Sequence, residues 1–174
     1  MTYAKPLTQL AKPDWMSDTD WQATMKACES DAIIRRDGKA HAELYRRTGG
    51  KEGYYLGGAP VLLLTTIGRK SGAKVTTPLN FLREGSGYVV VGSLAGAAED
   101  PHWVKNLEKE SRAWVQHKEE VWEADVRRVI REERAALWPR LIKAMPLWDV
   151  FVNRTDREFP IFMLTPKGGA IERV

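Results

Sequence analysis

The segment PVLLLTTIGRKSGAKVTTPLNFL, residues 60–82, decides the fold of this chain. Two runs rich in apolar and β-branched residues, at 60–67 and 74–84, flank the short turn at residues 68–72. Runs of this length bounded by glycine turn signals predict two strands joined as an antiparallel hairpin. From Pro60 to Arg83 the hairpin carries four basic residues and no acidic residue. The turn therefore raises the question of which anion it binds.

The segments around this hairpin predict a small barrel with flanking helices. Where the chain is apolar or alternates between apolar and polar residues, further strands are expected at residues 87–95, 112–118, 121–129 and 159–166. Helices are expected from about residue 18, at about 38–47, at 101–110 and across 131–154, where Pro139 and Pro146 kink or divide the helix. About six mostly antiparallel strands with flanking helices define an α+β fold built on one barrel.

The N-terminal part is expected to pack on this barrel. Residues 1–13 predict an extended arm, and residues 14–48 predict two helices, the second ending at Gly49 and Gly50. Ser17 to Asp20 can cap the first helix. An apolar stripe at helical spacing follows, formed by Trp21, Met25, Cys28 and Ala32. Contact of this stripe with a membrane surface is the alternative to packing on the barrel.

Length and composition fit one domain over residues 1–174. The chain has 43% hydrophobic and 29% charged residues and a net charge of +4, which is typical of a folded protein and too weak to indicate nucleic-acid binding. Cys28 has no disulfide partner, and the N-terminal residues lack the apolar core of a secretory signal. We therefore expect a cytoplasmic protein. The three histidines are scattered and the standard nucleotide-binding motifs do not occur, so we predict no metal site.

The turn at residues 68–72 has the composition of an anion site. Successive backbone N–H groups in a tight turn form a concave anion receptor, and glycines allow a ligand to approach closely. Arg69 adds a planar fork, Lys70 a point charge and Ser71 a hydroxyl donor. The alternative is an ordinary turn whose charges are solvated.

A second segment supports a ligand site near this turn. The glycines and alanines of residues 92–98 leave room for a flat ligand against the backbone. A helix expected to begin at Pro101, with Asp100 as its N-cap, directs its positive dipole end to the same region. Trp103 and Asn106 lie one turn apart on that helix. The alternatives are core packing for Trp103 and a solvated helix face for Asn106.

Four segments together resemble a known family. They are LLLTTIGRKSG (62–72), PLNFL (78–82), VVVGSLAGAAEDPHWVKNL (89–107) and RTDREFPIFML (154–164). In order and spacing they are similar to the deazaflavin-dependent nitroreductase and quinone reductase family of actinobacteria, whose members use coenzyme F-420. The resemblance covers residues 45–166. It implies a split β-barrel related to the flavin-binding, pyridoxamine-oxidase-like proteins, in agreement with the barrel predicted from the residues.

The resemblance implies where the cofactor binds. In the family a G-R-K-[ST]-G turn holds the phosphate and the glutamate tail of F-420, a role that falls here on Arg69, Lys70 and Ser71. Lys74 is a further candidate for the tail because of its charge. The deazaflavin ring is then expected along Thr77, Pro78, Val91 and Ser93, with His102, Trp103 and Asn106 closing the pocket.

The reaction implied is hydride transfer from reduced F-420 to a quinone-like, nitro or other conjugated hydrophobic acceptor. An oxyanion that develops on the acceptor needs a hydrogen-bond donor, for which Ser93 is the first candidate and Asn80 the second. For Ser93, the alternative is a hydroxyl that caps a strand end.

The acceptor side is expected to be lined by Asn80, Met145, Trp148 and Phe151, although ordinary core packing is the alternative for the last three. Family members often carry tyrosines at these four positions and a lysine in place of Leu94. This chain therefore has fewer hydroxyl groups on the acceptor side and one cation fewer near the cofactor.

Two other functions fit the same fold. One is an FMN-dependent reductase, which would be a yellow protein. The other is a carrier that binds a flavin or haem without turnover. In each case the expected partner is a small molecule and no nucleic acid is involved.

Overall fold

The decisive hairpin forms as predicted, with Val61 opposite Asn80 and Ile67 opposite Lys74. The computed structural model describes residues 4–171. Its strands are β1 (Tyr55–Leu56), β2 (Ala59–Ile67), β3 (Lys74–Glu84), β4 (Gly87–Val91), β5 (Ala113–His117), β6 (Glu120–Val129) and β7 (Ile161–Ile171). Its helices are α1 (Asp18–Ala27), α2 (Asp31–Thr48), α3 (His102–Lys109), α4 (Arg131–Ala144) and α5 (Leu147–Val152), with short 3-10 turns η1 (Leu7–Gln9) and η2 (Leu94–Gly96).

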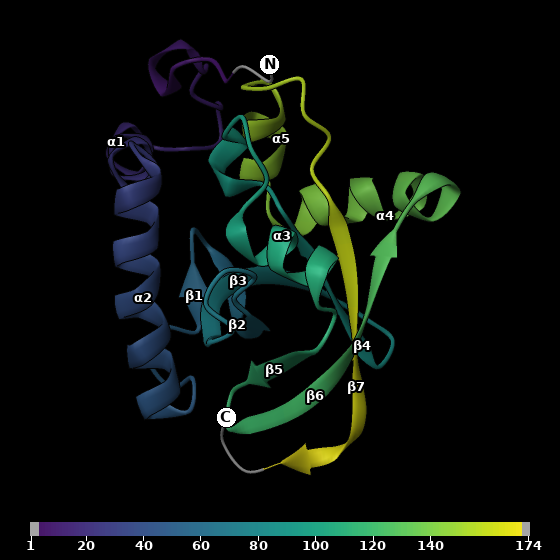
Figure 1. The fold of residues 1–174 in the computed structure, drawn as a ribbon. Helices are drawn as coiled ribbons and strands as arrows, with labels where there is room; N and C mark the ends of the chain where they lie inside the picture. Colours follow the sequence, from purple (N-terminus) through teal and green to yellow (C-terminus); the bar gives the residue numbers. More distant parts are fainter. Residues whose placement is uncertain (1–3, 172–174) are drawn as a thin grey trace.

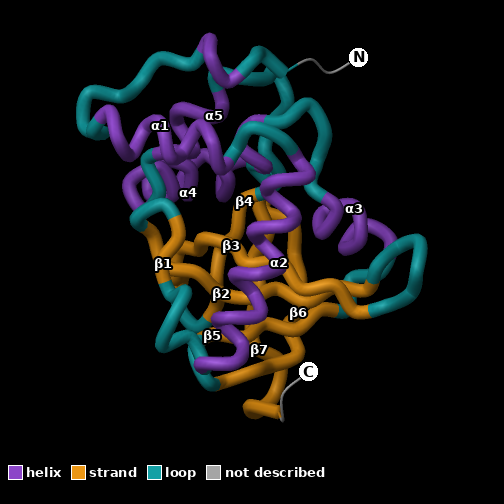
Figure 2. Tube along the Cα trace, turned by 90° about the vertical axis from the view of Figure 1, so that its left-hand side faces the viewer, coloured by secondary structure: helices purple, strands orange, loops and turns teal. Residues whose placement is uncertain are grey.

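Six strands close into a barrel. Their order is β2-β3-β4-β7-β6-β5, and β5 pairs back onto β2. All these pairings are antiparallel. The predicted α+β barrel is confirmed; β1, which was not predicted, adds a two-residue pairing to the start of β2. Figures 1 and 2 show α1, α4 and α5 gathered at one end of the molecule, with the barrel extending away from them.

Alternate residues along the strands fill the barrel interior. Leu62, Leu64, Phe81 and Val90 belong to one interior cluster of buried residues, as expected for side chains that alternate between the two faces of a strand. The apolar face of α3 contributes Trp103, Val104 and Leu107 to the same cluster. The barrel is therefore packed with side chains near α3.

The outer faces of the strands are covered by helices. Val89 and Val91 of β4 pack in a cluster with residues of α4 and α5. α2 covers the outer face of β2, where Tyr45 is fully buried against Val61 and Leu63. Figure 2 shows α2 running across the strands. A Cβ added to Gly38 of α2 would lie 3.7 Å from Pro78, so the helix also lies over β3.

The helix that sequence analysis expected at about residues 38–47 begins seven residues earlier, at Asp31. Ser30 is its N-cap and accepts a hydrogen bond from the Ile33 N–H (3.3 Å), a signal that we missed. The predicted stripe is consequently split between two helices: Trp21 and Met25 lie on α1, whereas Ala32 is exposed on α2. Met25 and Cys28 pack against the outer cluster, which supports packing on the barrel over membrane contact.

Two predicted caps have different outcomes. Ser17 caps α1 and accepts from the Asp20 N–H (3.1 Å), as predicted. Asp100 does not cap α3, because the helix begins at His102 and Pro101 is its N-cap without a side-chain bond. Asp100 instead pairs with Arg157 at 2.6 Å.

The predicted strand boundaries are most in error where loops or bulges intervene. The strand expected at 87–95 ends at Val91, because the chain then turns through three left-handed residues. β7 runs to Ile171, beyond the expected end at residue 166. The predicted division of the long helix occurs at Pro146, which separates α4 from α5, whereas Pro139 is accommodated inside α4.

Candidate cofactor site

The turn between β2 and β3 is held closed by its own backbone. The Gly68 N–H donates to the Ala73 carbonyl (2.8 Å), and the Gly72 N–H donates to the Gly68 carbonyl (2.7 Å). Gly72 has φ +70°, a conformation that favours glycine. A Cβ at Gly68 would lie 2.7 Å from Ser71 Oγ. Gly72 therefore supplies the left-handed residue of the turn, and a side chain at Gly68 would displace the Ser71 hydroxyl.

The turn and the start of α3 enclose a depression of about 200 Å³. It is lined by residues from two separate segments of the chain: Gly68, Arg69, Lys70, Ser71, Val75, His102 and Asn106. Five of these residues were predicted to bind the cofactor. The structure thus brings together the turn and the helix in the way that the sequence suggested.

Asn106 orients Arg69 within this depression. Its Oδ1 accepts hydrogen bonds from the Arg69 backbone N–H (3.1 Å) and from the Arg69 guanidinium (3.3 Å). Its Nδ2 donates to Thr66 Oγ1 (3.0 Å), and the side chain is almost completely buried. Lys109 also donates to the Arg69 carbonyl (3.0 Å). Asn106 therefore fixes the turn to α3 and is not on a solvated helix face. It also lines the depression, and its contact with the cofactor stays a prediction.

The electrostatic environment of the depression is positive. Burial lowers the pKa of His102, and the nearby Arg69, Arg35 and Lys105 lower it further, while Asp31 acts in the opposite direction. The imidazole is consequently neutral at pH 7 and can donate or accept a hydrogen bond. Lys70 is exposed at the rim, where its charge faces solvent and an incoming anion.

Six of the predicted cofactor residues do not line the depression, and Trp103 and Lys74 are two of them. Trp103 is 4% exposed and packs against Phe162 in the barrel interior, with ring centroids 5.6 Å apart. The core alternative is therefore correct for Trp103, because α3 turns its apolar face into the barrel. Lys74 lies with its Nζ 4.3 Å from the centroid of the Trp114 ring, a cation–π contact on the outer surface.

The residues predicted along the deazaflavin ring alternate in direction. Thr77 and Pro78 are neighbours on β3, so their side chains point to opposite faces. Pro78 lies beneath α2, near Gly38. Val91 is 4% exposed and packs in the outer cluster. One flat ring cannot contact all these side chains at once. A ring bound here would have to lie against the strand backbone instead.

Asn80 does not have the position of an oxyanion donor. Its Nδ2 donates to the carbonyls of Leu56 (2.9 Å) and Ala59 (3.1 Å). The amide protons are thus used to hold the turn between β1 and β2. The prediction that Asn80 is a second catalytic donor is corrected for this reason.

Ser93 lies at the start of an unusual loop. The next three residues, Leu94, Ala95 and Gly96, have φ values of 43°, 49° and 71°. Left-handed conformations are costly for residues with a Cβ and persist only where the surroundings enforce them. Ser93 is half-buried, and the described structure gives its hydroxyl no hydrogen bond. The hydroxyl is therefore available to a ligand.

Arg157 enforces this loop, and its role was missed in the sequence. Its guanidinium donates to the carbonyls of Gly92 (2.9 Å), Ser93 (2.8 Å) and Ala97 (3.0 Å) and to the carboxylate of Asp100 (2.6 Å). Arg154 adds a bond to the Ala95 carbonyl (2.9 Å). These arginines lie about 60 positions from the loop, and a single sequence gives no signal that pairs them with backbone carbonyls.

The residues expected to line the acceptor side are buried. Met145, Trp148 and Phe151 are at most 6% exposed and belong to the outer cluster. A Cβ at Gly57 would lie 3.1 Å from the Met145 side chain, and a Cβ at Gly96 would lie 2.4 Å from the Phe151 carbonyl. The core alternative is thus correct for these side chains as they stand, and the Met145 side chain and the Phe151 backbone lie against the segments that contain Gly57 and Gly96.

The segments that form the candidate site are also the ones that match known proteins. The family model described as F420H(2)-dependent quinone reductase matches residues 37–166. This chain belongs to that family. The match includes the turn at 68–72, the Ser93 loop and Arg157, and it begins inside α2, so the arm and α1 lie outside it.

Individual family members agree with this assignment. Rv3178 of Mycobacterium tuberculosis, provisionally named an F420H(2)-dependent quinone reductase, is 34% identical over 62% of this chain and 91% of its own length. The F420H(2)-dependent quinone reductase Rv1261c of the same organism is 40% identical, but over only 40% of this chain and 47% of its own. A solved F420-H2 dependent reductase, FDR-A, is 32% identical over 60% of this chain and 93% of its own, with a TM-score of 0.56.

Two other features do not occur within residues 4–171. No helix there is long and apolar enough to cross a membrane. No group of three or more histidine, cysteine or acidic side chains there could hold a metal ion.

Proposed function

We propose that this chain is a reductase that transfers a hydride from reduced F-420 to a quinone-like or other conjugated hydrophobic acceptor. The observation that carries the proposal is the depression at the β2–β3 turn, where Arg69, Lys70 and Ser71 converge with His102. Family membership supplies the cofactor class, and the depression supplies a matching chemistry.

The residues of the depression fit a phosphate and carboxylate ligand. Arg69 is already oriented by Asn106, so less side-chain freedom is lost when an anion binds. Lys70 is exposed and its charge reaches solvent. Val75, an exposed apolar side chain in the same lining, gives a surface for the uncharged part of the ligand. Lys74 is a weaker candidate, because it is engaged with Trp114.

When bound, reduced F-420 supplies the hydride. The protein must hold the acceptor in line and stabilise charge on its oxygen. The Ser93 hydroxyl is the donor that we assign to this oxygen, because it is half-buried and not engaged elsewhere. Arg157 holds the Ser93 carbonyl and so fixes the direction of this residue. Arg157 is a positioning residue in this scheme.

The acceptor is proposed to lie between the Ser93 loop and the turn that Asn80 holds. The Phe151 carbonyl lies against Gly96 of the first, and the Met145 side chain lies near Gly57 of the second. Because these side chains are apolar where many relatives carry tyrosines, we expect a preference for hydrophobic quinones over nitro compounds.

Cofactor titration tests the proposal against its alternatives. The purified protein is titrated with F-420 and with FMN at low and high salt, and oxidation of reduced F-420 by a naphthoquinone is then followed without oxygen. We expect tighter binding of F-420, weaker binding at high salt because exposed charges are screened, and oxidation that depends on the acceptor. Equal affinity for FMN in low salt favours an FMN enzyme, and tight binding without oxidation favours a carrier.

A further inference from the structure

The end of the barrel opposite the cofactor turn holds a second cavity. It measures about 1250 Å³ and opens between the connector that follows α2, the β3–β4 hairpin and the β5–β6 turn. Leu63 of β2 pairs with Gln116, next to His117, whereas Arg69 follows the other end of β2. At about 3.3 Å per residue, the two sites are roughly 20 Å apart along the strand.

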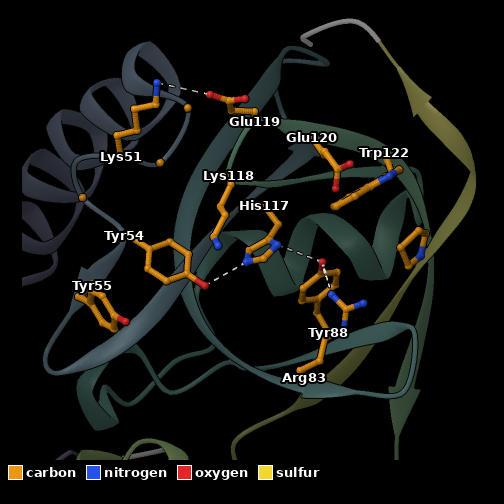
Figure 3. A pocket seen from close by; sticks show the side chains of 14 residues that line it. Lys51, Tyr54, Tyr55, Arg83, Tyr88, His117, Lys118, Glu119, Glu120 and Trp122 are labelled. Atoms are coloured by element: carbon orange, nitrogen blue, oxygen red, sulfur yellow. Dashed lines mark hydrogen bonds and ion pairs between the residues drawn. The ribbon is translucent and has the colours of Figure 1, made fainter.

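A chain of hydrogen bonds crosses this cavity (Figure 3). The Arg83 guanidinium donates to Tyr88 Oη (2.6 Å). Tyr88 Oη lies 3.3 Å from His117 Nδ1, and His117 Nε2 lies 3.1 Å from Tyr54 Oη. The four side chains come from the connector, β3, β4 and β5, so the chain spans the cavity from wall to wall.

The burial of Tyr88 determines which atoms donate and which accept in this series of hydrogen bonds. Tyr88 is 1% exposed, so its hydroxyl proton must be used internally, and His117 Nδ1 is the acceptor within reach. Burial, Lys118 and Arg83 lower the pKa of His117, with Glu120 opposing them, so the ring is neutral at pH 7. Its Nε2–H then donates to Tyr54 Oη. The O–H of Tyr54 remains to donate into the cavity.

Lys118 is fixed at the same place by its backbone. It has φ +57°, a left-handed conformation that residues with a Cβ adopt at a cost. The buried Tyr45 hydroxyl accepts from the Lys118 N–H (2.8 Å), and the buried Gln116 amide donates to the Lys118 carbonyl (2.9 Å). A positive φ at this position is what the two-residue turn between β5 and β6 requires, and the two hydrogen bonds hold the Lys118 backbone in place. Figure 3 shows the ammonium directed toward Tyr54 and His117, and it lies 5.3 Å from the centroid of the Tyr54 ring.

The rest of the cavity lining is aromatic, and the lining as a whole carries a net positive charge. The Tyr88 and Trp122 rings stack at 6.1 Å, and Tyr88 lies 5.3 Å from His117. Lys51 is neutralised by Glu119 at 3.7 Å. Within residues 4–171, Arg83 and Lys118 have no carboxylate in an ion pair, and Glu120 is the one lining acid left to oppose them.

We propose that this cavity binds a planar aromatic carboxylate, whose carboxylate contacts the Lys118 ammonium and the Tyr54 hydroxyl while its ring lies on the half-buried His117. The two donors on one side suit an anion, and the aromatic side chains suit a flat ring. The site is separate from the proposed cofactor site and does not depend on it.

The test uses the full chain and benzoate as the probe, with binding followed by ligand-observed NMR. Benzamide, which lacks the charge, and cyclohexanecarboxylate, which lacks the aromatic ring, are the matched ligand controls. We expect benzoate to bind best and to stay bound when F-420 is added or when Arg69 is replaced by alanine. Displacement by F-420, equal binding of benzamide, or no benzoate binding at millimolar concentration would each overturn the proposal.

Variants of Lys118 separate binding from folding. Lys118→Gln should weaken benzoate binding about tenfold, the equivalent of one charge-assisted hydrogen bond. Lys118→Gly should weaken it as much while the melting temperature stays equal or rises, because glycine accepts the left-handed conformation. Lys51→Gln, which removes a paired lysine from the same cavity, is the control and should bind normally. Unchanged binding in both Lys118 variants contradicts the proposed site.

Discussion

At one end of the barrel the cations sit on a five-residue turn, whereas at the other end they come from segments far apart in the chain. Arg69 and Lys70 are neighbours in sequence, and the turn that carries them is closed by its own backbone and tied to α3 through Asn106 and Lys109. Arg83 and Lys118 lie 35 positions apart, and they line one cavity because the barrel closes. The cations of the first site are therefore placed by a local turn, whereas those of the second are placed by the whole barrel.

The largest loss of stability is expected at Arg157, which connects the Ser93 loop to the segment between α5 and β7. Arg157→Ala removes the partner of Asp100 and one hydrogen bond from each of three carbonyls, of which Ser93 keeps its bond from the Gly96 N–H. We expect the free energy of unfolding to fall by about 3–5 kcal/mol. Urea unfolding measures this loss. Arg128→Ala removes an exposed ion pair with Glu108 and should cost less than about 1 kcal/mol.

A folded Arg157→Lys variant tests whether the two ends of the barrel function independently. Lysine keeps the charge but cannot reach several carbonyls at once. Oxidation of reduced F-420 should therefore fall while benzoate binding at the far cavity is retained. If Arg157→Ala is no less stable than Arg128→Ala, the loop is not held by this residue.

Ser93→Ala should act on the rate of hydride transfer more than on cofactor affinity. Removal of one oxyanion donor costs on the order of 2.7–4 kcal/mol, about a hundredfold in rate or more. Water in place of the hydroxyl would reduce this loss. Single-turnover oxidation of pre-bound reduced cofactor separates the two quantities. An unchanged single-turnover rate removes Ser93 from the mechanism.

Arg69→Ala tests whether the turn is a site or a solvated loop. We expect cofactor affinity to fall by about 1–3 kcal/mol, the value of a charge-assisted hydrogen bond, with little loss of stability. Lys74→Ala, a variant with the same charge change on the same hairpin, should have a smaller effect because Lys74 lies on Trp114. Equal effects in a cofactor titration would restore Lys74 to the site.

The smallest effect concerns one histidine at each end. Burial is the main cause that lowers the pKa of both His102 and His117. Protonation therefore favours the unfolded chain, so the stability that each contributes is complete above its unfolded pKa of about 6.5 and is lost as the pH falls further. His117→Asn should reduce the loss of stability on acidification more than His102→Asn, since His117 is deeper. Urea midpoints measured above and below this pH give the answer.

The contrast between local patterns and contacts between distant segments also explains how much of the fold and site could be predicted from the sequence. The strands, the barrel class and the turn at residues 68–72 depend on local patterns, so they were found. Asp100 was read as a helix cap because its partner Arg157 is 57 positions away, and Trp103 could not be distinguished from a pocket residue until α3 was seen facing the barrel interior. Asn80 and the cavity at Tyr54 and His117 depend on contacts between distant segments. No pattern along the chain records such contacts.

The strand order has a consequence for how the protein is made. Within residues 4–171, β7 is the last strand in sequence, yet it lies between β4 and β6. While the chain is being synthesised, β4 and β6 therefore each have one edge without a partner, and open edges of this kind can pair with other chains. Closure must wait until residues 161–171 have left the ribosome. Slow folding is expected from such distant pairings, and the nascent chain needs protection during this interval.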